Sequence, residues 1–341
     1  MFRPDFQITN LILQNIAEIE ASKQIIENAP LVPAWERKFR EETVVRQVHH
    51  SIAVEGNDLN YTEAKDVLEG KEVETIRRRD IKEILNYREA VEFITKNKEV
   101  DLNKSFVLGV NKILLKDILE PKELGKFRGK GMIIMNAETQ NIVMEPPPAD
   151  EVEGEVEELI EWFNTSTEVN SILKSGILQH EMTRIHPFIE GNGRTARLLS
   201  TWSLYRYDYN IKQFFSLEEY YDQDPKGYYE ALGSADDGEL STWLEYFTRG
   251  LAVELGRVKA KILDISRDVK VRRTVGQVAL NDRQIKIIKF IEDNGQLQNQ
   301  DFEELFADVS DDTILRDLKD LIDKNLVKKR GKTKAARYEL I

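Results

Sequence analysis

A single twelve-residue segment, residues 186–197, contains most of the side chains in this chain that could perform chemistry together. It reads His-Pro-Phe-Ile-Glu-Gly-Asn-Gly-Arg-Thr-Ala-Arg, so a histidine, a carboxylate, an asparagine between glycines and two arginines follow in close order. Gly191 and Gly193 allow a tight backbone turn that exposes N–H groups. A helix predicted to begin near Arg194 would direct its positive end to the same place, where anions bind readily. We therefore predict a binding site for a phosphate chain with a base beside it.

The charged residues of this segment support that prediction. Arg194 and Arg197 are three positions apart and would project from one face of the helix. Two cations near a helix N-terminus are unfavourable, so the pair favours a polyanionic ligand. His186 is a candidate general base, because an unperturbed imidazole is about half deprotonated near neutral pH. Glu190 is either an ordinary solvated carboxylate or a ligand for Mg²⁺, which commonly takes one carboxylate together with phosphate oxygens.

Two other motifs are absent. His180 and Glu181 invite comparison with a zinc-protease helix, but Arg184 stands where that motif needs its second histidine. We therefore expect a packing or hydrogen-bonding role for His180. The G-x-x-x-x-G-K-[ST] phosphate loop does not occur either.

The composition of the chain excludes several classes of function. At 341 residues it can hold two or three domains with a substantial core. Its net charge of −12 argues against generic adhesion to nucleic acid or to an anionic membrane. The absence of cysteine excludes disulfides and thiolate metal sites. No apolar run is long enough to span a bilayer, and the first residues lack the apolar core of a secretory signal, so we expect a soluble cytoplasmic protein.

Apolar residues at three- and four-residue spacing predict helices over most of the chain. The predicted helices are Leu11–Ile26, Arg79–Thr95, Val152–Phe163, Ser171–Ile185 and Thr195–Tyr205, with a long helical connector within 236–281. Residues 131–145 instead predict a short β-hairpin, which three consecutive prolines close off.

The C-terminal residues predict a separate small domain. Its predicted elements are a helix over Asp282–Glu292, a short helix over Asn299–Phe306, a helix that Ser310 caps and that reaches Lys324, and strands over Leu326–Arg330 and Arg337–Leu340. Three helices and a basic β-wing resemble a winged helix-turn-helix. Residues 276–341 hold twelve Lys and Arg against thirteen Asp and Glu, whereas phosphate contact needs clustered cations. We therefore favour target recognition or dimerisation over direct DNA binding.

The order of residues 186–197 resembles the signature of the Fic family, His-x-Phe-x-(Asp/Glu)-Gly-Asn-Gly-Arg-x-x-Arg, and every fixed position is met. The resemblance extends over residues 30–250. Most Fic proteins transfer AMP from ATP to a Ser, Thr or Tyr hydroxyl of a target protein. The resemblance thus implies a protein adenylyltransferase (AMPylase) with a mainly α fold. That fold would be a Fic-type helical bundle with a β-hairpin flap, followed by the C-terminal winged helix-turn-helix domain.

The resemblance also implies a mechanism, an in-line attack on the α-phosphate of ATP. His186 would take the proton of the target hydroxyl, and Glu190 would hold Mg²⁺. Asn192 is expected to hold phosphate oxygens through its amide and its backbone. Thr195 and Ala196 are expected to offer N–H groups of the first helical turn, which lack an intrahelical partner. The full set of implied ATP-binding residues is Glu55, His186, Gly191, Asn192, Gly193, Arg194, Thr195, Ala196, Arg197 and Tyr229.

A second motif lies far upstream. Ser51-Ile-Ala-Val-Glu-Gly-Asn resembles the inhibitory motif of the same family, (Ser/Thr)-x-x-x-Glu-(Gly/Asn). Ser51 and Glu55 are four residues apart and would face one way on a helix that Gly56 ends. In the family this glutamate pairs with the second arginine of the signature, Arg197 here, and takes the place of the γ-phosphate. Alone, the string equally fits a helix cap or a surface charge. Together with the signature, it implies an autoinhibited enzyme.

Two further segments have counterparts in the family. The hairpin at residues 132–145 lies where the family has its flap, which holds the target segment by strand addition; a structural hairpin is the alternative. Gly125-Lys-Phe-Arg128 resembles the lead-in to that flap. Tyr229 lies where the family closes the adenine pocket, so it is expected to contact adenine or ribose. However, Asp224 and Pro225 stand where the family often has an asparagine, which leaves the base preference open.

The predicted organisation has four parts: an N-terminal helical region with the inhibitory motif (1–98), a catalytic core (99–235), a helical connector (236–275) and a winged helix-like domain (276–341). ATP is the expected substrate and a target protein the expected partner, with self-modification and homodimer formation left open. Two alternatives remain. The same site could remove AMP from a modified protein, with Glu55 positioning water. Alternatively, the Fic region could sense a nucleotide while residues 276–341 bind DNA.

Overall fold

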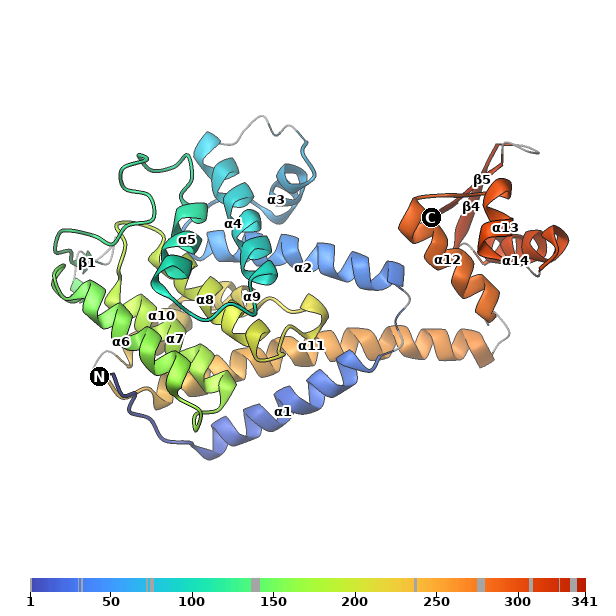
Figure 1. The fold of residues 1–341 in the computed structure, drawn as a ribbon. Coiled ribbons are helices and arrows are strands. Elements are labelled where there is room, and N and C mark those ends of the chain that lie inside the picture. Colours follow the sequence, from blue (N-terminus) through green and yellow to red (C-terminus); the bar gives the residue numbers. More distant parts are fainter. Residues whose placement is uncertain are drawn as a thin grey trace. The chain divides into compact units, whose positions relative to one another are not determined.

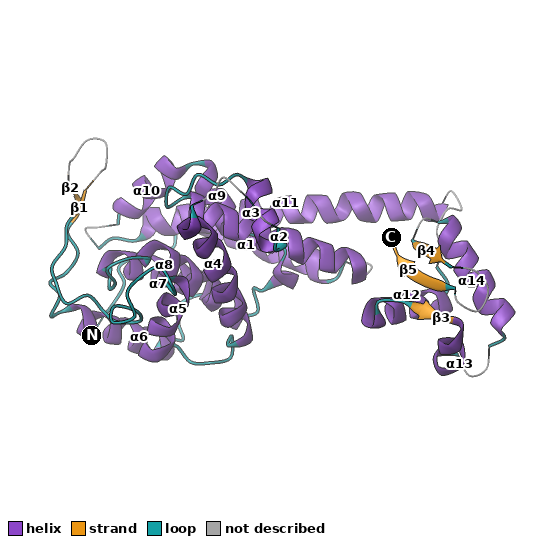
Figure 2. Ribbon diagram, turned by 90° about the horizontal axis from the view of Figure 1, so that it is seen from above, coloured by secondary structure: helices purple, strands orange, loops and turns teal. Residues whose placement is uncertain are grey.

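The computed structural model describes residues 2–29, 31, 33–71, 73, 77–135, 142–235, 238–274, 280–306, 309–324, 326–331 and 336–341. Within these ranges the chain is mainly helical, as predicted, and its strands are confined to a short hairpin and a small C-terminal sheet (Figure 2). The chain divides into two compact units, Met1–Asn28 with Phe39–Ala260, and Ala29–Lys38 with Lys261–Ile341. None of the helices in the described ranges combines the length and apolar character that a bilayer crossing requires.

The first unit is built almost entirely from helices (Figure 1). Two of them, α2 and α11, continue into the residues assigned to the second unit. The helices are α1 (Asn10–Glu27), α2 (Pro33–Ala53), α3 (Tyr61–Leu68), α4 (Arg78–Lys96), α5 (Lys104–Leu114), α6 (Val152–Thr165), α7 (Ser171–Ile185), α8 (Asn192–Arg206), the 3₁₀ turn η1 (Ile211–Gln213), α9 (Leu217–Gln223), α10 (Pro225–Gly233) and α11 (Ser241–Thr274).

The core of this unit is formed around α7 and α8, which pack along each other. Both helices are buried on nearly every face, including most of their polar residues. The α8 helix also contacts α4 and α5, while α6 covers α7. A helix that is buried all round is held in place by its neighbours on each side. The N-terminus of α8 therefore has a fixed position, which is where the signature segment lies.

The boundaries of these two helices differ in how well the sequence predicts them. The predicted range of α7, Ser171–Ile185, is confirmed, and the Asn170 side chain accepts a hydrogen bond from the Ile172 N–H at its start. The α8 helix begins at Asn192, earlier than the predicted start near Arg194. The reason is Gly191, which serves as the N-cap in a left-handed conformation (φ +77°).

The predicted hairpin forms antiparallel strands β1 (Ile134–Met135) and β2 (Ile142–Met144). Ile134 pairs with Met144. Its predicted turn, residues 136–141, lies outside the described residues. Ile133, Met135 and Ile142 are all at least half exposed, so the described part of the hairpin presents apolar side chains to solvent.

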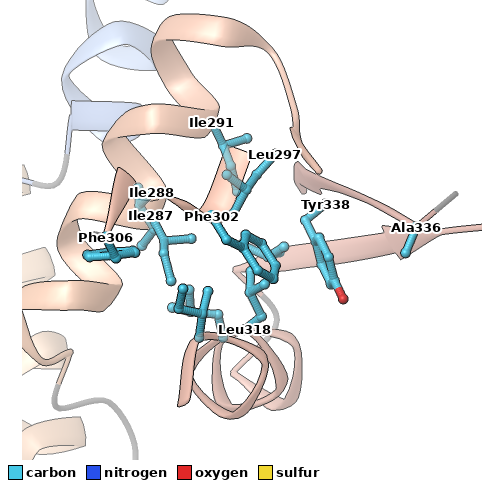
Figure 3. Close-up of a cluster of buried hydrophobic side chains, with 12 residues drawn as sticks. Ile287, Ile288, Ile291, Leu297, Phe302, Phe306, Leu318, Ala336 and Tyr338 are labelled. Atoms are coloured by element: carbon cyan, nitrogen blue, oxygen red, sulfur yellow. The ribbon is translucent and has the colours of Figure 1, made fainter. Parts of the chain in front are cut away.

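The second unit contains α12 (Asp282–Asn294), β3 (Leu297–Gln298), η2 (Asn299–Asp301), α13 (Phe302–Leu305), α14 (Asp311–Asp323), β4 (Val327–Arg330) and β5 (Arg337–Leu340). The three strands form an antiparallel sheet in the order β3-β5-β4. A cluster of buried apolar side chains from α12, α13, α14 and the sheet forms its core, with Leu318 and Phe302 near the centre (Figure 3). The short strand β3 was not predicted, because two residues carry no readable alternation.

Replacing Leu318 by alanine should destabilise the second unit. Leu318 is 0% exposed, and its truncation leaves a cavity that typically costs about 2–5 kcal/mol. Hydrogen exchange of the full chain, measured by mass spectrometry on peptides from residues 282–340, should show reduced protection of their backbone amides. The control Ile285→Ala removes a 51% exposed side chain from α12 and should change protection little. Equal effects of the two substitutions would contradict the assigned core.

Candidate active site

His186 occupies a strained backbone position at the end of α7. It is the C-cap residue, in a left-handed conformation with φ +49° and ψ +58°. Such a conformation costs a non-glycine residue about 1–3 kcal/mol, so surrounding contacts must hold it. Arg128, which is only 3% exposed, provides them. Its Nε donates to the His186 carbonyl at 2.8 Å, and its backbone N–H donates to the Pro187 carbonyl at 2.8 Å.

The ring of His186 is held in a tautomer suited to a base. Its Nδ1 lies 3.2 Å from the carbonyl of Thr183, which can only accept, so Nδ1 carries the hydrogen. The Nε2 atom is then left with a free lone pair. Burial lowers the pKa of His186 below 6.5, and the nearby Arg128 adds to this effect, whereas Thr183 and Glu55 oppose it. The imidazole is therefore neutral, and able to accept a proton, at neutral pH.

The loop between α7 and α8 is held closed by Asn192. The Asn192 Oδ1 accepts the Phe188 N–H at 2.8 Å, and its Nδ2 donates to the Phe188 carbonyl at 2.9 Å. Phe188 is buried and packs against Phe127. Both of its polar atoms therefore hold the loop, while the second Nδ2 hydrogen and the backbone N–H are not used in these two bonds. The expected contact of Asn192 with phosphate oxygens stays a prediction.

The start of α8 corrects the expectation for Thr195 and Ala196. The Thr195 N–H donates to the Gly191 carbonyl at 2.9 Å, so it forms the first helical hydrogen bond. Ala196 lies one residue further into the helix. The N–H groups that precede this first bond belong to Asn192, Gly193 and Arg194. An anion at this helix end would meet these three groups.

Glu190, the predicted metal ligand, is paired with two arginines. Its carboxylate forms ion pairs with Arg79 from α4 and, at 3.5 Å, with Arg194. Its backbone carbonyl accepts a hydrogen bond of 3.0 Å from Asn111 of α5. The side chain is 27% exposed and so remains accessible from solvent.

Arg194 is buried beside this carboxylate. It is 4% exposed and lies 3.5 Å from Glu83 of α4 as well as from Glu190. Its Nε atom has no hydrogen-bond partner among the described residues. Glu83 also accepts from Asn57 at 3.0 Å and from Arg79 at 3.2 Å. Glu83 thus links α4, the start of α8 and the segment that follows Glu55.

The second arginine of the signature, Arg197, contacts the upstream motif directly. It is 2% exposed, and its Nη2 donates to Glu55 Oε1 at 2.8 Å and to the Ser51 carbonyl at 3.0 Å. Its Nε donates to the Ser51 hydroxyl at 3.2 Å. Burial opposes charge on both partners, yet Glu55 keeps the pKa of Arg197 well above its usual value, and Arg197 with Arg194 keeps the pKa of Glu55 low. Both groups are therefore charged at neutral pH.

This contact depends on two glycines. A Cβ at Gly193 would lie 2.4 Å from Glu55 Oε1 and 3.1 Å from Arg197 Nη1, so only glycine lets the carboxylate approach. Gly56 has φ +83°, which turns the chain after the helix. The α2 helix itself ends at Ala53. Glu55 therefore lies in the turn beyond it, not on the helix as predicted, although it still meets Arg197 together with Ser51.

Tyr229 lies beside the same turn. Its hydroxyl donates to the Val54 carbonyl at 3.2 Å, and the side chain is 50% exposed. Its neighbour Tyr228 is buried and stacks on Tyr221. Of this pair, only Tyr229 offers a surface that a ligand could reach.

Several residues that organise the site were not predicted from the sequence. Arg128 was noted only within a four-residue resemblance, and Asn111 has no distinctive sequence context. Arg79 and Glu83 are four residues apart on a predicted helix, a spacing that indicates an ion pair but not its partners in α8. Their roles depend on helix packing, which a sequence pattern does not specify.

Comparison of the sequence with known proteins finds a matching family model and several similar proteins. The model of the Fic/DOC family matches residues 101–204. A protein named protein adenylyltransferase Fic from Drosophila willistoni is 24% identical over 251 residues, which cover 68% of this chain and 45% of that protein. The namesake from Nematostella vectensis is 25% identical over 224 residues, 61% of this chain and 47% of that protein. The chain thus spans about half the length of these curated relatives.

Solved structures show the same fold. A Fic family protein from Desulfovibrio desulfuricans G20 superposes with a TM-score of 0.70 at 23% identity, covering 100% of this chain and 98% of that one. A Fic domain containing signaling protein from Bacteroides thetaiotaomicron gives a TM-score of 0.61 at 19% identity, covering 75% and 97%.

The titration of His186 should report the charge of Glu55. Because Glu55 acts to raise the pKa of His186, the isosteric substitution Glu55→Gln should lower it further. NMR of the imidazole Cε1–H signals, assigned with His186→Ala, measures the shift. Glu41→Gln, which neutralises an exposed carboxylate of α2, is the control and should leave the pKa of His186 unchanged. An unchanged or raised pKa of His186 would contradict the assigned geometry.

Proposed function

We propose that this chain, whose residues 101–204 match the model of the Fic/DOC family, transfers AMP from ATP to a hydroxyl group of a target protein, and that Glu55 keeps it inactive. The observation that carries the proposal is the pairing of buried Arg197 with Glu55 and Ser51 at the N-terminal end of α8. A buried guanidinium beside free helix N–H groups is suited to bind phosphate, and here a carboxylate takes that place.

His186 acts as the general base. Its Nε2 takes the proton of the target hydroxyl while the hydroxyl oxygen attacks the α-phosphorus of ATP. A new P–O bond forms to the target, and the bond to the oxygen that bridges to the β-phosphate breaks, so pyrophosphate leaves. The N–H groups at the start of α8, together with Arg194 and Arg197, stabilise the charge on the phosphates. Catalysis of this kind rests on positioning, which the fixed loop between α7 and α8 supplies.

Inhibition follows because Glu55 and the γ-phosphate of ATP compete for the guanidinium group of Arg197. Glu55 offers Arg197 the charge-assisted hydrogen bond that a γ-phosphate would otherwise accept. The carboxylate also lies directly over Gly193, in the space next to the helix N–H groups. A γ-phosphate and the Glu55 carboxylate cannot occupy this space together. ATP would then bind in an unproductive position until Glu55 moves.

Glu190 is the residue proposed to hold Mg²⁺. Its carboxylate oxygen fits this hard cation, and it is partly exposed beside the helix N-terminus. In the described structure Arg79 and Arg194 share this carboxylate, so metal binding requires at least Arg79 to release it. The ion would supply positive charge to the phosphates.

The β1–β2 hairpin is proposed to bind the target segment by strand addition, since its described part exposes apolar side chains. For the second unit we propose protein recognition or dimerisation on a winged helix-like domain. Lys328 and Arg330 both pair with Glu339, which partly neutralises the wing. Asp311 and Asp312 lie in the first turn of α14 and would repel DNA phosphates.

Replacing Glu55 by glycine should raise AMP transfer by tenfold or more, because Arg197 becomes free to bind phosphate. Incorporation of label from α-³²P-ATP into protein, including the chain itself, measures the effect. Glu41→Ala removes an exposed carboxylate from α2 and should leave labelling unchanged. Equal labelling by the wild type and the Glu55 variant would disprove inhibition.

Replacing His186 by alanine in the Glu55→Gly background should lower labelling by about 10²–10⁴-fold, the usual contribution of a general base. Binding of ATP, measured by calorimetry, should persist.

The reverse reaction is tested by incubating the wild type with a pre-AMPylated protein. Release of AMP by the wild type, with no labelling by either variant, would favour the hydrolytic alternative instead.

A further inference from the structure

A second group of titratable side chains lies at the contact between α2 and α9, outside the site described above. It consists of His49 and His50 on α2 and Asp222 on α9. One potential ligand atom from each residue lies within 4.8 Å of the other two. All three side chains are partly buried and therefore still reachable from solvent. The proposed transfer reaction uses none of them.

The His49 ring is held in an orientation suited to metal ligation. Its Nε2 lies 3.0 Å from the Leu59 carbonyl, which can only accept, so Nε2 carries the hydrogen. Its Nδ1 is then an unprotonated nitrogen. This atom is buried and has no hydrogen-bond partner among the described residues. Ligating histidines commonly donate their other ring N–H to a backbone carbonyl in the same way.

His50 on α2 and Asp222 on α9 are the other two potential metal ligands. The His50 Nδ1 lies 2.8 Å from Asp222 Oδ2, so the carboxylate reaches across to α2. The rings of His49 and His50 are 4.7 Å apart, edge to face. Two imidazoles and one carboxylate are typical of sites for divalent transition metals, with the remaining position taken by water. Mg²⁺ and Ca²⁺ prefer oxygen ligands and fit this set poorly.

We propose that His49, His50 and Asp222 form a binding site for a divalent transition metal ion of the Zn²⁺ class. Such an ion satisfies the unpartnered nitrogen of His49 and replaces the direct contact between His50 and Asp222. It also fastens α2 to α9 at a point where Arg46 and Glu219, 2.7 Å apart, already join the same two helices.

The position of this site has a consequence for inhibition, which rests on the proposed function. His50 directly precedes Ser51, whose hydroxyl and carbonyl both accept hydrogen bonds from Arg197. A metal ion at the end of α2 would hold the turn that carries Glu55 against Arg197. Bound Zn²⁺ should therefore lower AMP transfer by the wild type severalfold but leave the Glu55→Gly variant unaffected.

Metal binding is tested on the full chain without nucleotide. After treatment with a chelator, the chain is titrated with Zn²⁺ in competition with a chromophoric chelator, and its metal content is measured. We expect one equivalent per chain, and a Kd about 10–100-fold weaker for His49→Ala, His50→Ala and the isosteric Asp222→Asn. His186→Ala is the matched control and should bind as the wild type does. No binding, or binding that these three substitutions leave unchanged, would overturn the site.

A second measurement uses only the wild type, so it tests the site even if the substituted chains fail to fold. X-ray absorption at the zinc edge of the wild-type complex counts its imidazole ligands, and two are expected. Fewer than two would overturn the site. Because metal content and ligand count are measured without ATP, they decide the site whether or not the chain transfers AMP. Binding at this site with no effect on AMP transfer by an active wild type would contradict only the link to inhibition.

Discussion

A guanidinium buried to 2% exposure requires an anionic partner, and the rest of the site is arranged around this requirement of Arg197. In the described state Glu55 is that partner, assisted by the hydroxyl and carbonyl of Ser51. Removing one member of such a pair leaves an uncompensated charge, which is costly in a protein interior. A nucleotide phosphate would remove that cost. The same physical need therefore underlies two things that we propose, the inhibition by Glu55 and the affinity for ATP.

The contact between Glu55 and Arg197 joins two segments that are 142 residues apart in the sequence, the turn after α2 and the first turns of α8. The α8 helix is positioned by α4, α5 and α7, and its first turn by the loop that Asn192 holds. The turn that carries Glu55 is positioned by Gly56, by Tyr229 and by Asn57 through Glu83. The two sides of the contact are thus held by different sets of residues, so the turn that carries Glu55 and the loop before α8 are positioned independently.

Local signals in the sequence were sufficient to predict α7 and the strands β4 and β5, and to predict that the residues of the signature segment lie together. The start of α8 was misplaced, because the left-handed conformation of Gly191 allows the helix to begin at Asn192. The role assigned to the Thr195 N–H changed for the same reason, because this group donates to the Gly191 carbonyl. Arg79, Glu83 and Asn111 could not be assigned, since their partners lie on other helices and only tertiary packing brings them together. Glu55 was predicted to meet Arg197 from a family motif, whereas charge and spacing alone equally allowed a helix cap.

The competition of Glu55 with the γ-phosphate for Arg197 is tested most directly by comparing the affinities of ATP and ADP. Calorimetry in the His186→Ala background, with and without Glu55→Gly, gives the ratio of the two dissociation constants without turnover. The account predicts similar affinities for ATP and ADP while Glu55 is present. Without Glu55, ATP should gain about tenfold or more over ADP, as expected for one additional charge-assisted hydrogen bond. A ratio that stays the same when Glu55 is removed would contradict the account.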